Sequence, residues 1–164
     1  VMIGAGGSSI NSKFICHLSQ TCTNWNFKVI GNLSSSVLPY AENVILMKRV
    51  DDVAEVINSS AVIIGNTGHN TVMEIATLGK PFITVPEERP FEEQAVKAEA
   101  LEQLDLAIVV KPTELFTADW PAILDKAKNE SPDWGRHNND KALDEISDFI
   151  ERIYTKIFNP ATSI

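Results

Sequence analysis

The stretch from Gly65 to Pro86, GNTGHNTVMEIATLGKPFITVP, brings together residues that could bind an anionic ligand. Small and polar residues come where the apolar spacing predicts that a helix begins: Thr67, Gly68, His69, Asn70 and Thr71. The free backbone amides and the dipole of a helix start favour an anion such as phosphate. Asn70 and Thr71 can add side-chain donors, while His69 is either a further donor or a capping or solvated histidine.

Glu74 follows one turn into the same predicted helix, and its residue type fits two roles. Thr71-x-x-Glu74 matches a capping box, in which the glutamate side chain reaches back to the helix start. A carboxylate can also accept hydrogen bonds from two adjacent ribose hydroxyls. The spacing alone leaves both roles open.

A glycine-rich turn, GAGGSS, follows the first predicted strand and includes Gly6, Gly7 and Ser8. Glycines let backbone amides approach an anion closely. A dinucleotide fingerprint needs a third glycine, where this chain has Ser9, and an acid near the end of the second strand, where it reads VIGN. The turn therefore fits a phosphate loop or a tight connection without ligand better than an NAD site.

A polar loop, PEERPFEEQ, follows the fifth predicted strand. We interpret Glu87, Glu88 and the two later glutamates mainly as a solvated helix start, where acids suit the dipole. Arg89 can pair either with these acids or with a phosphate. Gln94 can both donate and accept, which suits sugar hydroxyls.

The elements that must position these residues alternate between strand and helix. Short apolar runs predict strands over 1–5, 27–32, 43–48, 61–66, 81–86 and 106–110. Periodic apolar residues predict helices over 8–20, 50–60, 69–78, 91–105, 118–129 and 139–157. This order predicts an α/β fold: a Rossmann-like, doubly wound parallel sheet of about six strands with helices on both faces. Ligands bind such sheets at the carboxyl ends of the strands.

The amino-acid composition and the net charge exclude several classes of function. The chain has 164 residues, 44% of them hydrophobic, which suits a single domain over 1–164. A net charge of −8 and a pI near 4.8 argue against a nucleic-acid or anionic-membrane binder. Two cysteines and no metal-ligand cluster predict reduced thiols, no metal site and a cytoplasmic protein. We find no signal peptide and no membrane span, and the initial Val suggests a fragment whose partner half is missing.

The run GNTGHNTVMEIATLGKPFITVPEERPFEEQ resembles the C-terminal, donor-binding half of the two-domain GT-B glycosyltransferases. It is most similar to the family 28 type, which includes the bacterial peptidoglycan UDP-N-acetylglucosamine transferases. Thr-Val-x-Glu-Ile followed by Gly-x-Pro, Val-Pro and a downstream Gln carries the resemblance over about 30 residues. The strand–helix order extends it over roughly 1–110.

The resemblance implies a role for each matching position. Glu74 would bind the ribose hydroxyls of a UDP-sugar, and residues 68–71 would face its diphosphate and sugar. The backbone of Val50 would meet the uracil, and residues 6–8 would form a phosphate loop. Gln94 matches the second member of a Gln-Gln pair that contacts the sugar; the first member is Glu93 here, which leaves the sugar open.

By the same resemblance, the chain would be the UDP-sugar donor domain of a hexosyltransferase, with UDP-N-acetylglucosamine or a related donor. Transfer in the complete enzyme would be inverting and metal-independent, and no cofactor is expected. The acceptor site and the general base would belong to an N-terminal domain or subunit, so this domain alone would carry no catalytic residue and be inactive. The alternatives are a non-catalytic nucleotide-binding or regulatory module of the same fold and a dinucleotide-dependent oxidoreductase.

Overall fold

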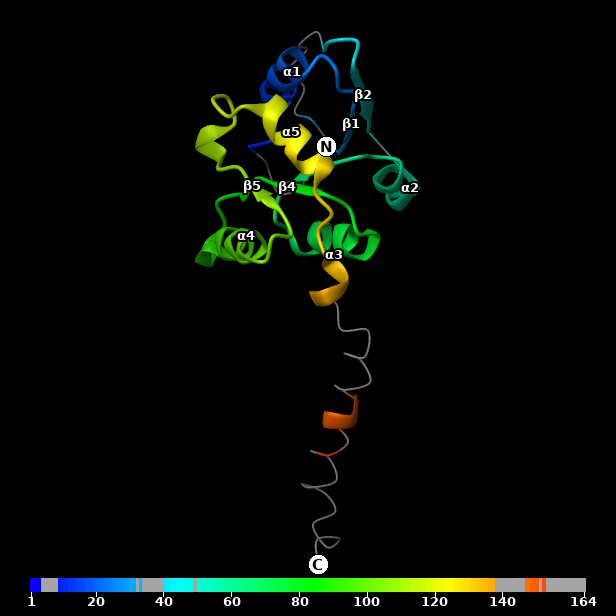
Figure 1. Cartoon of the computed structure of the whole chain (residues 1–164), viewed down its shortest axis with the longest axis vertical. Helices are drawn as coiled ribbons and strands as arrows, with labels where there is room; N and C mark the ends of the chain where they lie inside the picture. The colour runs from blue at the N-terminus through cyan, green and yellow to red at the C-terminus, as the bar shows by residue number, and fades with distance from the viewer. Residues whose placement is uncertain are drawn as a thin grey trace, which may run out of the picture. The chain divides into compact units, whose positions relative to one another are not determined.

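The computed structural model describes residues 1–3, 9–31, 33, 40–48, 50–137, 147–150 and 152 (Figure 1). The chain divides into two units, Val1–Trp134 and Gly135–Ile164. In the second unit, residues 147–150 and 152 are helical, and most of the helix predicted over 139–157 lies outside the described residues. The first unit holds all the strands of the described chain.

Five strands form in the first unit: β1 Phe27–Ile30, β2 Val44–Met47, β3 Ile63–Gly65, β4 Phe82–Thr84 and β5 Ile108–Val109. β1 pairs with β2, and β3, β4 and β5 form a second sheet, with every pairing parallel. About six strands in one sheet were predicted; the described residues hold five assigned strands in two sheets. Of the strand predicted over 1–5, residues 1–3 are described, and Met2 forms an isolated parallel bridge with Ile30; residues 4 and 5 lie outside the described residues.

The N-terminal segment, residues 1–3, lies between the two sheets. Ile3 N donates to Ile30 O at 2.9 Å and Ile30 N to Val1 O at 2.8 Å, while Met2 N donates to Ile64 O at 2.8 Å. The order is thus β2–β1–segment–β3–β4–β5, which is 3-2-1-4-5-6 in chain order. This is the strand order of the Rossmann fold, whose ligand crevice opens where the order reverses, here between the segment and β3.

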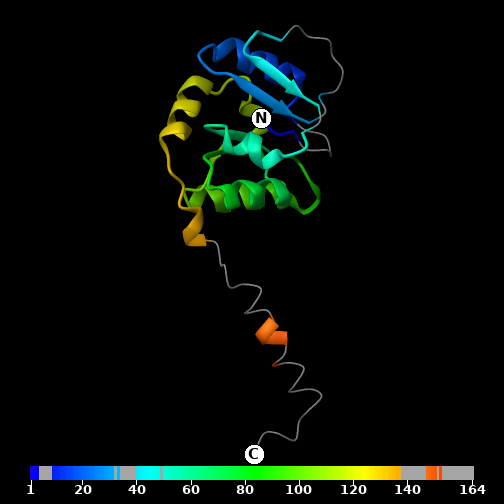
Figure 2. The ribbon, with the colours of Figure 1, turned by 90° about the vertical axis from the view of Figure 1, so that its right-hand side faces the viewer.

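Helices cover both faces of the strands, as predicted. On one face lie α1 (Ser12–Thr21) and α5 (Trp120–Asn129), and on the other α2 (Val53–Asn58), α3 (His69–Leu78) and α4 (Glu93–Gln103). Figures 1 and 2 show α3 and α4 on the side of β4 opposite to α1. Successive residues of β3 point to opposite faces: Ile64 packs with α1 and α5, and Ile63 packs with α2, α3 and α4. The first unit also contains two short 3-10 turns, η1 Pro90–Glu92 and η2 Pro112–Glu114, and a third, η3 Trp134–His137, begins at its last residue.

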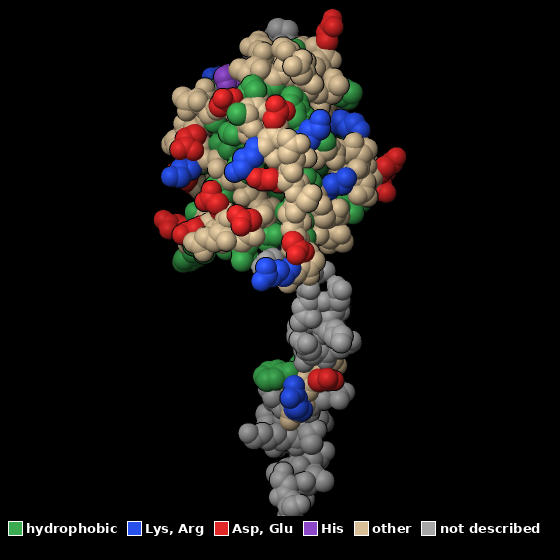
Figure 3. Space-filling view, in the orientation of Figure 1, with side chains coloured by type: hydrophobic (Ala, Val, Ile, Leu, Met, Phe, Trp, Pro, Cys, Tyr) green, Lys and Arg blue, Asp and Glu red, His purple; other side chains and the backbone are tan. Residues whose placement is uncertain are grey.

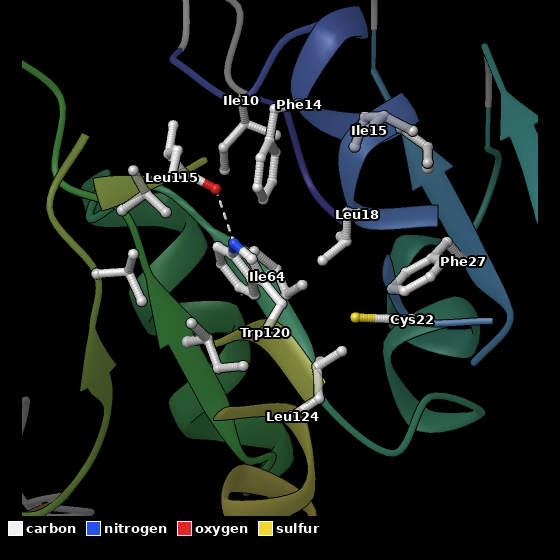
Figure 4. Packing of buried hydrophobic residues seen from close by; sticks show 14 of the residues in the cluster. Ile10, Phe14, Ile15, Leu18, Cys22, Phe27, Ile64, Leu115, Trp120 and Leu124 are labelled. Atoms are coloured by element: carbon white, nitrogen blue, oxygen red, sulfur yellow. Dashed lines mark hydrogen bonds between the residues drawn. The ribbon is translucent and has the colours of Figure 1, made fainter. Parts of the chain in front are cut away.

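The larger hydrophobic cluster centres on Trp120 and Phe14, both fully buried (Figure 4). Their ring centroids are 5.0 Å apart, and Trp120 Nε1 donates to Leu115 O at 2.8 Å. The indole therefore fills the space between α1 and α5 while its polar atom is satisfied. This packing fixes α1 and α5 against the strands, whose ends carry the predicted site residues.

Four helices begin later than predicted: α1 by four residues, α2 by three, and α4 and α5 by two each. The late starts of α1 and α4 have a local explanation. α1 begins at Ser12, where 8 was expected, because Asn11 Oδ1 accepts hydrogen bonds from Lys13 N at 3.0 Å and Phe14 N at 3.1 Å and so caps the helix. α4 begins at Glu93, where 91 was expected. Phe91 and Glu92 adopt φ values of 63° and 53°, which interrupt the helix before it starts.

Gly79 ends α3 in the left-handed conformation, with φ 63° and ψ 32°. A Cβ placed there would have no heavy atom within 4 Å, so a side chain would meet only backbone strain. We expect Gly79→Ala to lower the free energy of unfolding by about 1–2 kcal/mol, measured by urea denaturation. Gly79→Asn is the control and should lose less, since asparagine tolerates this conformation. Equal losses for both variants would contradict the explanation.

No helix in the described part of the chain combines the length and the apolar character needed to cross a membrane.

Candidate functional site

The carboxyl ends of the parallel strands place several sequence-predicted residues along one edge. The segment 1–3 and β3 are neighbours there, and their following helices, α1 and α3, cover opposite faces. The strand order therefore reverses between the segment 1–3 and β3, and the loop after β3 lies at this point. Residues Gly6, Gly7 and Ser8 lie outside the described residues, so their predicted role stays a prediction.

The loop between β3 and α3 is held by side-chain hydrogen bonds. Asn66 Oδ1 accepts from Gly68 N at 3.1 Å, which makes an Asx turn. The hydroxyls of Thr67 and Thr84 are 3.0 Å apart, and both residues are fully buried. The hydroxyl of Thr67, predicted as a site residue, thus joins the ends of β3 and β4 under the site. These hydrogen bonds hold the loop in its conformation without a ligand.

The start of α3 has no side-chain cap. Gly68 is its N-cap, and the first helical bond runs from Val72 N to Gly68 O at 3.0 Å. The amides of His69, Asn70 and Thr71 therefore have no acceptor within the helix. The side chains of His69 and Asn70 are exposed, and Thr71 is partly buried. The geometry leaves the amides and the helix dipole for an anion.

The structure excludes the capping-box role of Glu74. Because Gly68 is the N-cap, Thr71 occupies the third helical position and Glu74 lies a further turn along the helix. The Glu74 side chain is exposed. It lines a cavity of about 440 Å³ between α2 and α3, formed by Asp51, Asp52, Val53, Ala54, Ile57, Met73, Glu74, Thr77 and Leu78. Val50, half-buried, precedes this lining by one residue.

A second group of contacts connects the loop after β4 with Ser9 and α4. Glu87 Oε1 accepts from Ser9 N at 2.6 Å, and Glu87 Oε2 accepts from Ser9 Oγ at 2.9 Å. Glu87 N donates to Gln94 Oε1 at 3.0 Å, and Gln94 is only 7% exposed. The interpretation of Glu87 as part of a solvated helix start was therefore wrong. Gln94 lies at the predicted edge, with its side-chain oxygen already engaged.

Arg89 lines a different cavity from Glu74. This cavity, of about 810 Å³, lies between the loop 86–92, α4 and residues 109–113, and Lys111 also lines it. Carboxylates gather over α4 in Figure 3, in keeping with the exposed Glu93, Glu99 and Glu102. Glu93 forms an ion pair with Lys97, at 3.0 Å. The structure thus groups Glu74 with α2 and the start of α3, and places Arg89 beside Glu87 on the α4 side.

Four residues of the site were missed from the sequence: Ser9, Asn66, Thr84 and Glu87. The role of Asn66 could have been predicted, since an asparagine two residues before a glycine at a helix start favours an Asx turn. No local sequence pattern could have predicted the pairing of Ser9 with Glu87, because the two residues are 78 positions apart. Long-range pairing of this kind follows from the strand order and not from local spacing.

Among the described residues, no group of three or more His, Cys, Asp and Glu side chains is placed to hold a metal ion.

The two cysteines are free thiols that differ in burial. Cys22 is only 3% exposed, and burial raises the pKa of its thiol, with smaller contributions from the carboxylates of Asp119 and Asp125, while a hydrogen bond from Thr21 opposes them. We expect Cys16 alone to react promptly with a thiol reagent at pH 8, because the thiolate is the reactive form. Absorbance after mixing measures this, and Cys16→Ser should remove the fast phase. Equal rates for both thiols would contradict the burial of Cys22.

The comparisons with known sequences cover most of the chain. The family model described as "Glycosyltransferase family 28 C-terminal domain" matches residues 7–153. The chain is 34% identical over 125 residues to the UDP-N-acetylglucosamine–N-acetylmuramyl-(pentapeptide) pyrophosphoryl-undecaprenol N-acetylglucosamine transferase of Haemophilus ducreyi, covering 73% of this chain and 35% of that protein. It is 35% identical over 89 residues to an uncharacterised glycosyltransferase of Methanopyrus kandleri, covering 54% and 24%. The chain thus spans about a third or less of these relatives.

Solved structures agree on the fold. The glycotransferase of kitacinnamycin superposes with a TM-score of 0.67 at 15% identity, over 82% of this chain and 36% of that one. Acinetobacter baumannii MurG superposes with a TM-score of 0.66 at 15% identity, over 92% and 49%. The likeness at this identity concerns the fold, and it supports the Rossmann-like architecture of GT-B enzymes.

Proposed function

Because this chain belongs to the glycosyltransferase family 28 C-terminal domains, we propose that it binds the nucleotide-sugar donor, a UDP-sugar, for a glycosyltransferase. The observation that carries the proposal is the position of Glu74. Its carboxylate lines the cavity of about 440 Å³ between α2 and α3, on the same helix whose start lacks a side-chain cap. One helix then offers a carboxylate for ribose hydroxyls and free amides for phosphate.

The nucleoside would lie in this cavity. Val53, Ala54 and Ile57 supply apolar surface from α2, and Met73 supplies it from α3, which suits the faces of a base. The backbone of Val50, one residue before the lining, would meet the edge of the uracil. The Haemophilus ducreyi relative carries UDP-N-acetylglucosamine in its name, which supports uridine as the base and N-acetylglucosamine as the first sugar to test.

The diphosphate would lie at the start of α3. The amides of His69, Asn70 and Thr71 and the positive end of the helix dipole would hold its charge. In glycosyl transfer, negative charge grows on the departing UDP, so the same groups would stabilise the leaving group without a metal ion. Transfer with inversion at the sugar carbon is part of this proposal.

The acceptor would bind to a partner domain or subunit. The chain covers 35% of the length of its Haemophilus ducreyi relative, and its family is named for the C-terminal domain, so an N-terminal domain is expected to supply the acceptor site and the general base. We therefore expect this chain to bind the donor and to transfer no sugar alone.

Isothermal titration calorimetry on the 164-residue chain tests the proposal. UDP and UDP-N-acetylglucosamine should bind with measurable heat at millimolar concentration or below, and both should raise the melting temperature. NADH serves as the matched control, since it carries a diphosphate but no uridine, and should bind much more weakly. Absence of heat and of a thermal shift with UDP would refute the proposed function, and preferential binding of NADH would favour a dinucleotide enzyme.

A further inference from the structure

The contact between Glu87 and Ser9 has the form of an anion site that is filled by a side chain. Both carboxylate oxygens of Glu87 are engaged, one by Ser9 N at 2.6 Å and the other by Ser9 Oγ at 2.9 Å. An N–H and an O–H from one residue, converging on two oxygens of one anion, is also an arrangement that holds a phosphate group. These donors would accept a phosphate in place of the carboxylate.

The contact between Glu87 and Ser9 lies near the carboxyl ends of the strands, where folds of this type bind their ligands. Ser9 follows the N-terminal segment, Glu87 follows β4, and β3 lies between those two strands in the sheet. The contact between Glu87 and Ser9 therefore joins the chain on either side of β3, whose carboxyl end leads through Thr67 and Gly68 into α3. The strand order reverses between the segment 1–3 and β3, so the contact lies next to the expected ligand crevice.

We propose that Glu87 competes with the donor diphosphate for Ser9 and thereby sets the affinity of the site for nucleoside diphosphates, a proposal that rests on the proposed function. Two anions cannot share one pair of donors, and their like charges repel at short range. Binding of the diphosphate therefore displaces the carboxylate from Ser9.

The surroundings of Glu87 provide the displaced carboxylate with another position. Its side chain also lines the cavity of about 810 Å³, where Arg89 and Lys111 lie among four further carboxylates, those of Glu88, Glu92, Glu99 and Glu102, so the cavity offers room and two cations but no net positive charge. The backbone of Glu87 stays anchored, since Glu87 N donates to Gln94 Oε1 at 3.0 Å. A rotation of the side chain alone exchanges Ser9 for this cavity.

Titration of UDP, pyrophosphate and uridine into the wild-type chain and into Glu87→Gln tests the competition. Glu87→Gln keeps the size of the side chain and removes its charge, so UDP and pyrophosphate should bind about three- to tenfold more tightly. Uridine, which has no phosphate, should bind both proteins equally. Glu88→Gln removes the same charge from the exposed neighbouring residue and should change the affinity for UDP by less than about twofold.

The outcomes separate this inference from the proposed function. If UDP binds the wild-type chain and Glu87→Gln binds it no more tightly, the competition is refuted and the proposed function stands. If UDP binds neither protein, both are refuted. Should Glu87→Gln fail to fold, the wild-type chain provides the second readout, the side-chain carboxyl ¹³C resonance of Glu87. Saturation with UDP should shift this resonance, and an unchanged resonance would overturn the inference.

Discussion

Replacing Glu74 with alanine is expected to weaken UDP binding by about 1–3 kcal/mol, roughly 5- to 150-fold in Kd. The side chain lines the cavity between α2 and α3, is exposed, and caps no helix. Its loss should therefore remove hydrogen bonds to the ribose and leave the fold intact, with a change in unfolding free energy of less than about 0.5 kcal/mol. Calorimetric titration and urea denaturation measure the two effects.

Two controls locate the effect of Glu74→Ala. Glu102→Ala removes an equal charge from α4, at the other cavity, and should leave the Kd for UDP within about twofold. Pyrophosphate lacks the ribose, so its affinity should change little in Glu74→Ala. Equal weakening of UDP and pyrophosphate would contradict a ribose contact and would assign Glu74 a general effect on the start of α3.

Trp120→Ala should produce the largest loss of stability, about 3–5 kcal/mol. The indole is fully buried between α1 and α5, its centroid lies 5.0 Å from that of Phe14, and its Nε1 donates to Leu115 O (Figure 4). The substitution opens a cavity and leaves a buried carbonyl without its donor. Urea denaturation followed by circular dichroism measures the change in unfolding free energy.

Two matched variants divide this loss into its parts. Trp120→Phe keeps most of the ring and removes the donor, so it should cost less than Trp120→Ala. Phe116→Ala removes a second aromatic neighbour of Phe14, but Phe116 is 51% exposed, so its loss should be roughly 1 kcal/mol. A loss for Trp120→Ala no larger than for Phe116→Ala would contradict the assignment of Trp120 to the centre of the core.

The helix start at residue 69 and its end at Gly79 could be predicted from sequence because local chemistry determines them. Apolar spacing marks the buried face of α3, and a glycine ends it in a left-handed conformation that other residues adopt at a cost. All five strands fall within predicted ranges for a similar reason, since short apolar runs between turns favour strands, and β3 and β4 are fully buried, as suits strands covered on both faces.

The features that sequence could not supply depend on contacts between distant residues. The Thr71-x-x-Glu74 pattern left capping and ligand binding open, and only the position of Gly68 as N-cap excluded the first. The pairing of Glu87 with Ser9 arises because β4 and the N-terminal segment are two strands apart in the sheet. The late start of α4 follows from two left-handed residues, Phe91 and Glu92, neither of which is a glycine.

A crystal structure of the chain with UDP would show directly whether the nucleotide binds along α3. We expect both ribose hydroxyls within hydrogen-bond distance of the Glu74 carboxylate, with the uracil in the cavity between α2 and α3. We also expect phosphate oxygens at the amides of His69, Asn70 and Thr71. A nucleotide bound away from α3, or one whose ribose is out of reach of Glu74, would contradict this binding mode.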